Sequence, residues 1–156
     1  MDPVNDGERC MNYLRYGIVF VVTALGVGVL LKFASAAFAA SSLGSTMQVI
    51  VPGLIGAVVE GQQYAKANKA RPSNAAAWKF AWIGAGVATL LNIALAYGAG
   101  GFLPEFGKLA IVSPASKQFL LLIVIYSSAY LIGNRLFVVL GAGNQLSLMA
   151  SREERK

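Results

Sequence analysis

Few side chains in this chain could do chemistry, and one carboxylate among them has an unusual position. Glu60 is the first acidic residue after Glu8, and it ends an apolar run in the stretch GAVVEGQQYAKANKARP, where basic residues follow. The chain contains no histidine and a single cysteine, Cys10. A histidine base, a histidine-bound haem and an intrachain disulfide are therefore excluded. We predict no catalytic residue, no metal site and no cofactor.

Arg135 is the charge that we expect to neutralise Glu60. It lies within a second apolar stretch, QFLLLIVIYSSAYLIGNRLFVV, on the order of 26 Å along a helix from its start. When two opposite charges lie at similar depth in a membrane, pairing lowers the free-energy cost of burying each of them. We predict an ion pair between Glu60 and Arg135, with Asn134, Gln62 and Gln63 completing a polar cluster. The alternative is that each charge reaches water separately.

Three further polar residues fall in the middle of apolar stretches. Asn92 lies in FAWIGAGVATLLNIALAYG, and Ser127 and Ser128 lie in the stretch that contains Arg135. If the two stretches form antiparallel helices, these side chains have comparable depth. We predict a hydrogen bond from Asn92 to Ser127 or Ser128. Such bonds contribute roughly 0.6 kcal/mol in membrane proteins and serve packing.

The elements that position these residues are long apolar segments. Of the 156 residues, 56% are hydrophobic and only 13% charged, whereas a soluble domain carries about 25% charged residues. A helix of about 20 apolar residues crosses a bilayer. We predict an all-α fold, a single membrane domain over residues 1–156 with both termini cytoplasmic. Its four transmembrane helices cover about residues 17–33, 43–59, 80–98 and 118–139, and a basic cytoplasmic tail covers 140–156.

The positive charges fix the orientation. Nine Lys and Arg residues fall on one side of the predicted helices, and three on the other. The first group comprises Arg9, Arg15, Lys66, Lys69, Arg71, Lys79, Arg152, Arg155 and Lys156, and the second comprises Lys32, Lys108 and Lys117. Because positive residues are retained in the cytoplasm, we expect both termini and the central loop there.

Each predicted helix carries a pair of small residues four positions apart, which lets helices approach closely. The pairs are Ala24 with Gly28, Gly53 with Ala57, Gly84 with Ala88, and Ala129 with Gly133. Pro52 makes the second helix the one most prone to a kink. The aromatic residues near the helix ends are typical of an interfacial belt. They are Tyr13, Tyr16, Trp78, Trp82 and Tyr97.

These features favour a protein without enzymatic activity. Small-residue packing faces and sparse buried polarity are typical of an accessory or scaffold subunit within a larger membrane assembly. The expected partners are the lipid bilayer and another membrane protein or a second copy, not nucleic acid. The alternative is a small homo-oligomeric transporter with a gate around Pro52 and Glu60, since broken helices also build transport sites.

Four short motifs resemble the ABZJ family of small uncharacterised proteobacterial inner-membrane proteins. NYLRYG precedes the first predicted helix, VVEGQQYA ends the second, RPSNAAAWKFAW begins the third and GNRLF lies in the fourth. The resemblance covers most of the chain from Met11 onward. It implies four helices and a location in the bacterial inner (cytoplasmic) membrane, but no biochemical activity. One departure is Ala76, where members of the family have a glutamate.

Overall fold

The computed structural model describes residues 11–37, 43–99, 113 and 116–155, and all its regular elements there are helices. Helix α1 covers Tyr13–Ala37, α2 covers Leu43–Asn68, α3 covers Asn74–Ala99 and α5 covers Lys117–Glu153. The described part is therefore all-helical, as predicted, with four helices.

Polar residues begin three of the helices. The Asn12 side chain accepts hydrogen bonds from the backbone N–H groups of Leu14 and Arg15 at the start of α1. Ser73 accepts from Ala76 N–H before α3, and Ser116 accepts from Phe119 N–H before α5. Each of these side chains satisfies N–H groups that have no partner within the helix. The Ser73 bond caps α3 without a glutamate at Ala76.

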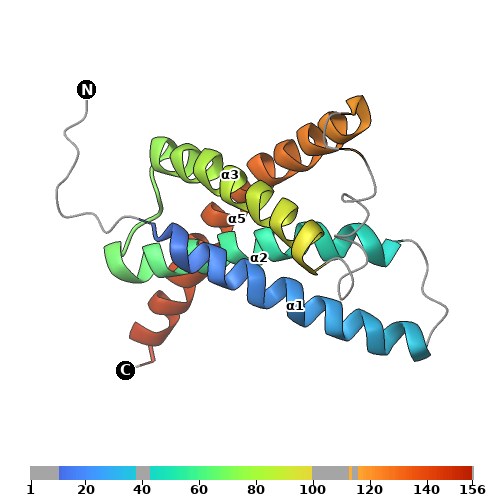
Figure 1. Ribbon diagram of the computed structural model, residues 1–156. Helices are drawn as coiled ribbons and strands as arrows, with labels where there is room; N and C mark the ends of the chain where they lie inside the picture. The colour runs from blue at the N-terminus through green and yellow to red at the C-terminus, as the bar shows by residue number, and fades with distance from the viewer. Residues whose placement is uncertain (1–10, 38–42, 100–112, 114–115, 156) are drawn as a thin grey trace.

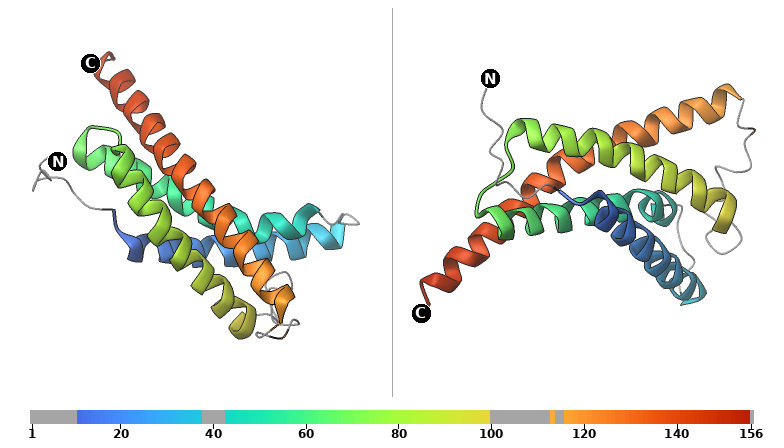
Figure 2. Two further views of the ribbon diagram at one scale, coloured as in Figure 1. Left: turned by 90° about the horizontal axis from the view of Figure 1, so that it is seen from above. Right: turned by 60° about the vertical axis from the view of Figure 1, so that its left-hand side comes forward.

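The helices form two crossing antiparallel pairs. Figure 1 shows α1 and α2 running side by side in opposite directions, and Figure 2 shows the same for α3 and α5. The most extensive contact joins the two pairs through α2 and α5, and α3 touches α2 only slightly. Helix α2 is therefore the main neighbour of α1, which also contacts α3.

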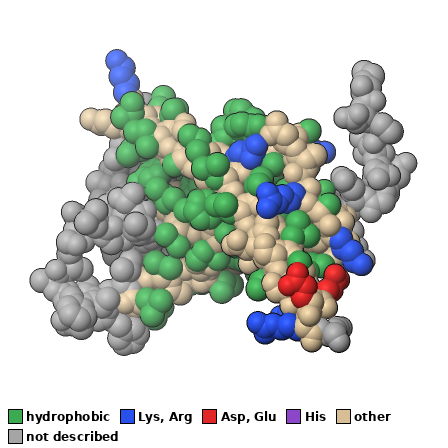
Figure 3. All heavy atoms as spheres, turned by 180° about the vertical axis from the view of Figure 1, so that it is seen from behind, with side chains coloured by type: hydrophobic (Ala, Val, Ile, Leu, Met, Phe, Trp, Pro, Cys, Tyr) green, Lys and Arg blue, Asp and Glu red, His purple; other side chains and the backbone are tan. Residues whose placement is uncertain are grey.

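This arrangement gathers one set of helix ends. The start of α1, the end of α2, the start of α3 and the C-terminal part of α5 lie toward the same end of the molecule (Figure 1). Most Lys and Arg side chains visible in Figure 3 lie at one end of the molecule, which we call the basic end. Arg15, Lys66, Lys69, Arg71 and Lys79 all belong to these helix ends or to the turn between α2 and α3.

Three helices are long and apolar enough to cross a membrane. The qualifying stretches are Tyr13–Leu30, Asn74–Ala99 and Lys117–Glu153, with mean hydropathies of 1.8, 1.6 and 1.6. The helices exceed the predicted spans because capping residues and polar turns extend beyond the apolar runs. Helix α5 in particular continues unbroken through residues 140–153, so this part of the predicted tail prolongs the fourth helix.

Aromatic side chains fill the centre of the bundle. Tyr16, Phe20, Phe80 and Tyr130 are all completely buried. Tyr16 meets Phe80 edge to face with ring centroids 5.5 Å apart, and Phe20 meets Tyr130 at 6.1 Å. The expectation that Tyr16 belongs to an interfacial belt is therefore wrong, because its ring faces the neighbouring helices. Trp82 and Tyr97 are exposed, at 66% and 52%.

Helices α2 and α5 approach closely enough for backbone to meet backbone. A methyl group added at Gly61 would collide with the Val138 carbonyl on α5, and one added at Gly141 would collide with the backbone of Val58 on α2. Only glycine leaves room for this approach.

The small residues singled out in the sequence lie mostly inside the bundle. A side chain at Gly53 would strike the Tyr130 ring, and one at Gly133 would strike Leu54. Seven of the eight predicted packing residues are buried, and Ala129 is half-buried. The buried residues are Ala24, Gly28, Gly53, Ala57, Gly84, Ala88 and Gly133.

Candidate functional site: polar contacts between the helices

Glu60 is completely buried on α2 and receives three hydrogen bonds from the start of the α1 region. Arg15 donates through Nε to Oε1 at 2.5 Å and through Nη2 to Oε2 at 2.9 Å. The backbone N–H of Asn12 donates to Oε2 at 2.9 Å. A two-pronged guanidinium–carboxylate contact is among the strongest hydrogen-bonded pairs in proteins. Glu60 therefore fastens α2 to α1 at the basic end.

The predicted ion pair between Glu60 and Arg135 is wrong. Arg135 donates from Nη2 to the Asn74 side chain at 2.6 Å, and its guanidinium lies 5.4 Å from the centre of the Trp78 ring. Both partners stand at the start of α3, so Arg135 joins α5 to α3. Arg15 reaches Glu60 instead because α1 and α2 are adjacent and antiparallel, which brings the start of one beside the end of the other.

A second polar cluster ties three helices together in the bundle centre. The Tyr130 hydroxyl on α5 donates to the Val49 carbonyl on α2 at 2.6 Å. Asn92 on α3, which is only 4% exposed, donates from Nδ2 to the same hydroxyl at 3.1 Å. The predicted bond from Asn92 to Ser127 or Ser128 is therefore wrong. The longer tyrosine side chain brings a hydroxyl to Asn92 from within the bundle.

The Val49 carbonyl lies in the helical turn that Pro52 disturbs. Proline has no N–H, so the carbonyl of Gln48, four residues earlier and next to Val49, loses its helical donor, and the ring crowds that turn. Helix α2 nevertheless continues through Pro52, which is itself fully buried. Tyr130 donates to the neighbouring Val49 carbonyl, so it adds a hydrogen bond from another helix to this turn.

A third contact connects α1 with α5. Tyr16 donates from its hydroxyl to Oδ1 of Asn134 at 3.1 Å, and both side chains are completely buried. The Asn134 amide nitrogen has no hydrogen-bond partner in the described part of the chain. It faces Gly84 on α3, where a side chain would come within 2.9 Å of it. Asn134 thus belongs to the bundle centre and not to a cluster with Glu60.

The two serines face a groove between α3 and α5. Ser127 and Thr89 share a hydrogen bond of 2.9 Å between their hydroxyls. Ser128 lines the same open groove of about 450 Å³ and is exposed. Its other lining residues are Trp82, Ala85, Gly86, Leu90 and Leu131, which make the groove predominantly apolar.

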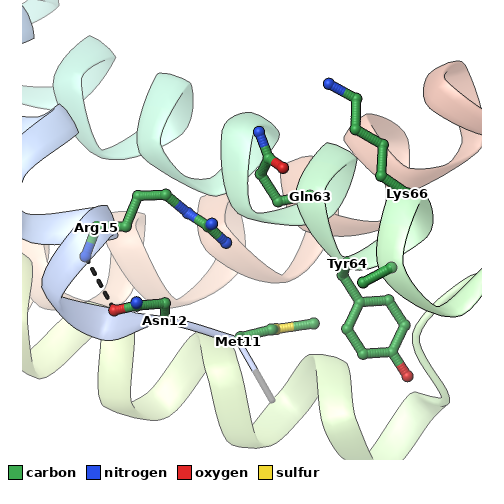
Figure 4. Close-up of a pocket in the computed structure, with 7 residues that line it drawn as sticks. Met11, Asn12, Arg15, Gln63, Tyr64 and Lys66 are labelled. Carbon is green, nitrogen blue, oxygen red and sulfur yellow. Dashed lines mark hydrogen bonds between the residues drawn. The ribbon is translucent and has the colours of Figure 1, made fainter. Parts of the chain in front are cut away.

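A more polar cavity of about 370 Å³ lies at the basic end beside Arg15. Figure 4 shows the Arg15 side chain extending from α1 toward α2, with Gln63 and Lys66 projecting from α2. The full lining is Met11, Asn12, Arg15, Gln63, Tyr64, Lys66 and Ala67. Two of these side chains are cationic, and further hydrogen-bonding groups come from asparagine, glutamine and tyrosine.

Sequence reasoning missed the residues that hold these contacts, above all Arg15, Tyr16 and Tyr130. A signal for Arg15 was present, since consecutive antiparallel helices bring the start of the first beside the end of the second. Nothing comparable marked the tyrosines, because a hydroxyl that bonds within the bundle and one that bonds at the interface look alike in sequence.

No protein-family model matches the chain, and neither a curated protein nor a solved structure matches it. Within the described residues, no group of three or more His, Cys, Asp or Glu side chains lies close enough to hold a metal ion.

Proposed function

We propose that this is a multi-pass protein of the bacterial inner membrane, with four membrane-spanning helices and both termini in the cytoplasm. Helix α2 has 26 residues, which at about 1.5 Å per residue exceeds a hydrocarbon core of about 30 Å. It lies antiparallel beside α1, whose apolar stretch meets the length requirement. The uneven distribution of Lys and Arg supports the orientation, and the resemblance to the ABZJ family supports the choice of membrane.

Within that membrane, we propose a non-enzymatic role as an accessory or scaffold subunit of a larger assembly. The observation that carries this proposal is the use of the buried polar side chains. Glu60 bonds to Arg15, Asn92 to Tyr130 and Asn134 to Tyr16, each between different helices. Because these polar groups bond to other helices, they stabilise one arrangement of the bundle. A single stable arrangement suits a scaffold protein on which other proteins assemble.

The same contacts weigh against the alternative of a transporter gated around Pro52 and Glu60. Movement of α2 at Pro52 would break the bond between Tyr130 and Val49, and movement at Glu60 would break the pair with Arg15. Either break would leave a buried polar group without a partner, at a cost of roughly 1–3 kcal/mol each.

Native mass spectrometry of the protein extracted in mild detergent from its own membrane tests the proposal. We expect a complex with a different membrane protein at a fixed ratio. The matched variants are Gly86→Leu, in the groove between α3 and α5, and Gly26→Leu on α1, since a Cβ atom added at either glycine meets no neighbouring atom within 4 Å. Loss of the partner in the first variant alone would place it in that groove. A discrete homo-oligomer with nothing else bound would favour the transporter.

A further inference from the structure

The cavity at the basic end combines positive charge with a position beside an expected membrane surface. Arg15 and Lys66 both line it, and Gln63 and Asn12 add neutral hydrogen-bonding side chains. They come from two elements, the start of the α1 region and the last turns of α2. At about 370 Å³ the cavity has room for a phosphate group and the atoms attached to it.

Among the described residues, the carboxylate beside this cavity is Glu60, and it does not oppose an anion. Glu60 is completely buried, and both of its oxygens accept hydrogen bonds from Arg15 or Asn12. Arg15 therefore stands between Glu60 and the cavity wall, with 39% of its side chain exposed. The ion pair also fixes the guanidinium in one orientation, which reduces the entropy lost when a ligand binds.

The donors of Arg15 are only partly used by Glu60. Nε and Nη2 bond to the carboxylate, whereas a guanidinium has five N–H groups. The remaining donors and the exposed Lys66 ammonium together suit an oxyanion with several acceptor oxygens.

We propose that this cavity binds a phosphate group, with Arg15 and Lys66 as its cationic contacts and Gln63 as a neutral donor. The phosphate belongs either to the headgroup of an anionic lipid or to a free phosphate compound. Basic pockets at the ends of membrane helices recognise lipid headgroups by this combination of charge and depth.

Titration of the purified full-length protein distinguishes the two sources. Anionic phosphatidylglycerol is added to the protein in detergent, and phosphatidylcholine, which has no net charge, is added in a separate series. Native mass spectrometry counts the lipid molecules that remain bound. Inorganic phosphate is added in a parallel series, with the thermal unfolding temperature as the readout. Retention of phosphatidylglycerol over phosphatidylcholine identifies a lipid site, whereas a rise in unfolding temperature with phosphate alone identifies a soluble ligand.

The variant Lys66→Gln tests the cavity itself, because Lys66 lines it and is exposed in the last turn of α2. We expect about fivefold weaker binding of the phosphate-bearing probe, the effect of one lysine at a membrane surface. Lys79→Gln is the matched control, since Lys79 is also exposed at the basic end but lies outside the cavity. If both variants bind the probe equally more weakly, the attraction is general to the charged surface and the proposal is overturned. It is also overturned if neither phosphatidylglycerol nor inorganic phosphate binds.

Discussion

At the scale of single residues, the ion pair between Arg15 and Glu60 is asymmetric. Glu60 is completely buried, whereas Arg15 remains 39% exposed. Removing Arg15 therefore leaves a buried carboxylate without its charged partner, but removing the charge of Glu60 leaves an arginine that reaches water. The two ends of one pair should consequently tolerate substitution very differently.

We expect Arg15→Gln to lower the free energy of unfolding by about 3–5 kcal/mol and Glu60→Gln to lower it by about 1–3 kcal/mol. Reversible unfolding in mixed detergent micelles, followed by the fluorescence of Trp78 and Trp82, measures both. The double variant should cost less than the sum of the single ones, because the two side chains act as a unit. Strictly additive effects would show that the pair contributes no coupling.

The Tyr130 hydroxyl holds two partners at once, and its removal tests the central cluster. Tyr130→Phe leaves the Asn92 amide and the Val49 carbonyl without this contact. We expect a loss of about 1–2 kcal/mol in the free energy of unfolding, above the average membrane hydrogen bond because two buried groups are affected. Tyr97→Phe is the control, since Tyr97 is 52% exposed. Equal effects in the two variants would argue against a central role for Tyr130.

At the scale of helices, the closest packing lies between α2 and α5. The glycines there differ sharply from other helix glycines in what an added methyl group would meet. At Gly61 and Gly141 the methyl group meets backbone atoms of the facing helix, which cannot rotate away, whereas at Gly86 and Gly98 it meets nothing. The contact between α2 and α5 therefore depends on particular glycines and not on small residues in general.

We expect Gly61→Ala to lower the free energy of unfolding by about 1–3 kcal/mol, because overpacking outweighs the better helix propensity of alanine. Gly86→Ala should leave stability unchanged or raise it by up to about 1 kcal/mol. The same detergent unfolding assay compares them. A neutral Gly61→Ala would mean that α2 and α5 are farther apart in the membrane than in this structure.

At the scale of the whole molecule, the proposed orientation puts the turn between α2 and α3 in the cytoplasm, because that turn lies at the basic end. In a Cys10→Ser background, we expect a cysteine at Ala70 to react with a membrane-impermeant maleimide only after cells are lysed. Cysteines at Ser42 and Ser113 should react in intact spheroplasts. If Ser42 and Ala70 are labelled from the same side, α2 does not cross the membrane and the proposed orientation has to be revised.

The class of fold, and the end of each helix that carries positive charge, could be predicted from the residues alone. Long apolar runs, absent histidine and the positions of Lys and Arg depend on composition and order alone, so no contact needs to be known to interpret them. The buried small residues were also recognisable, because their spacing follows the helical repeat.

Which polar groups meet could not be predicted in this way, because it depends on how the helices pack in three dimensions. Depth along a helix placed Glu60 and Arg135 at comparable levels, but rotation about the helix axis and the choice of neighbour directed Glu60 to Arg15 and Arg135 to Asn74. Asn92 likewise found Tyr130 and not Ser127. A hydrogen bond requires atoms within about 3 Å, and the sequence pattern places side chains only to within a helical turn, about 5.4 Å.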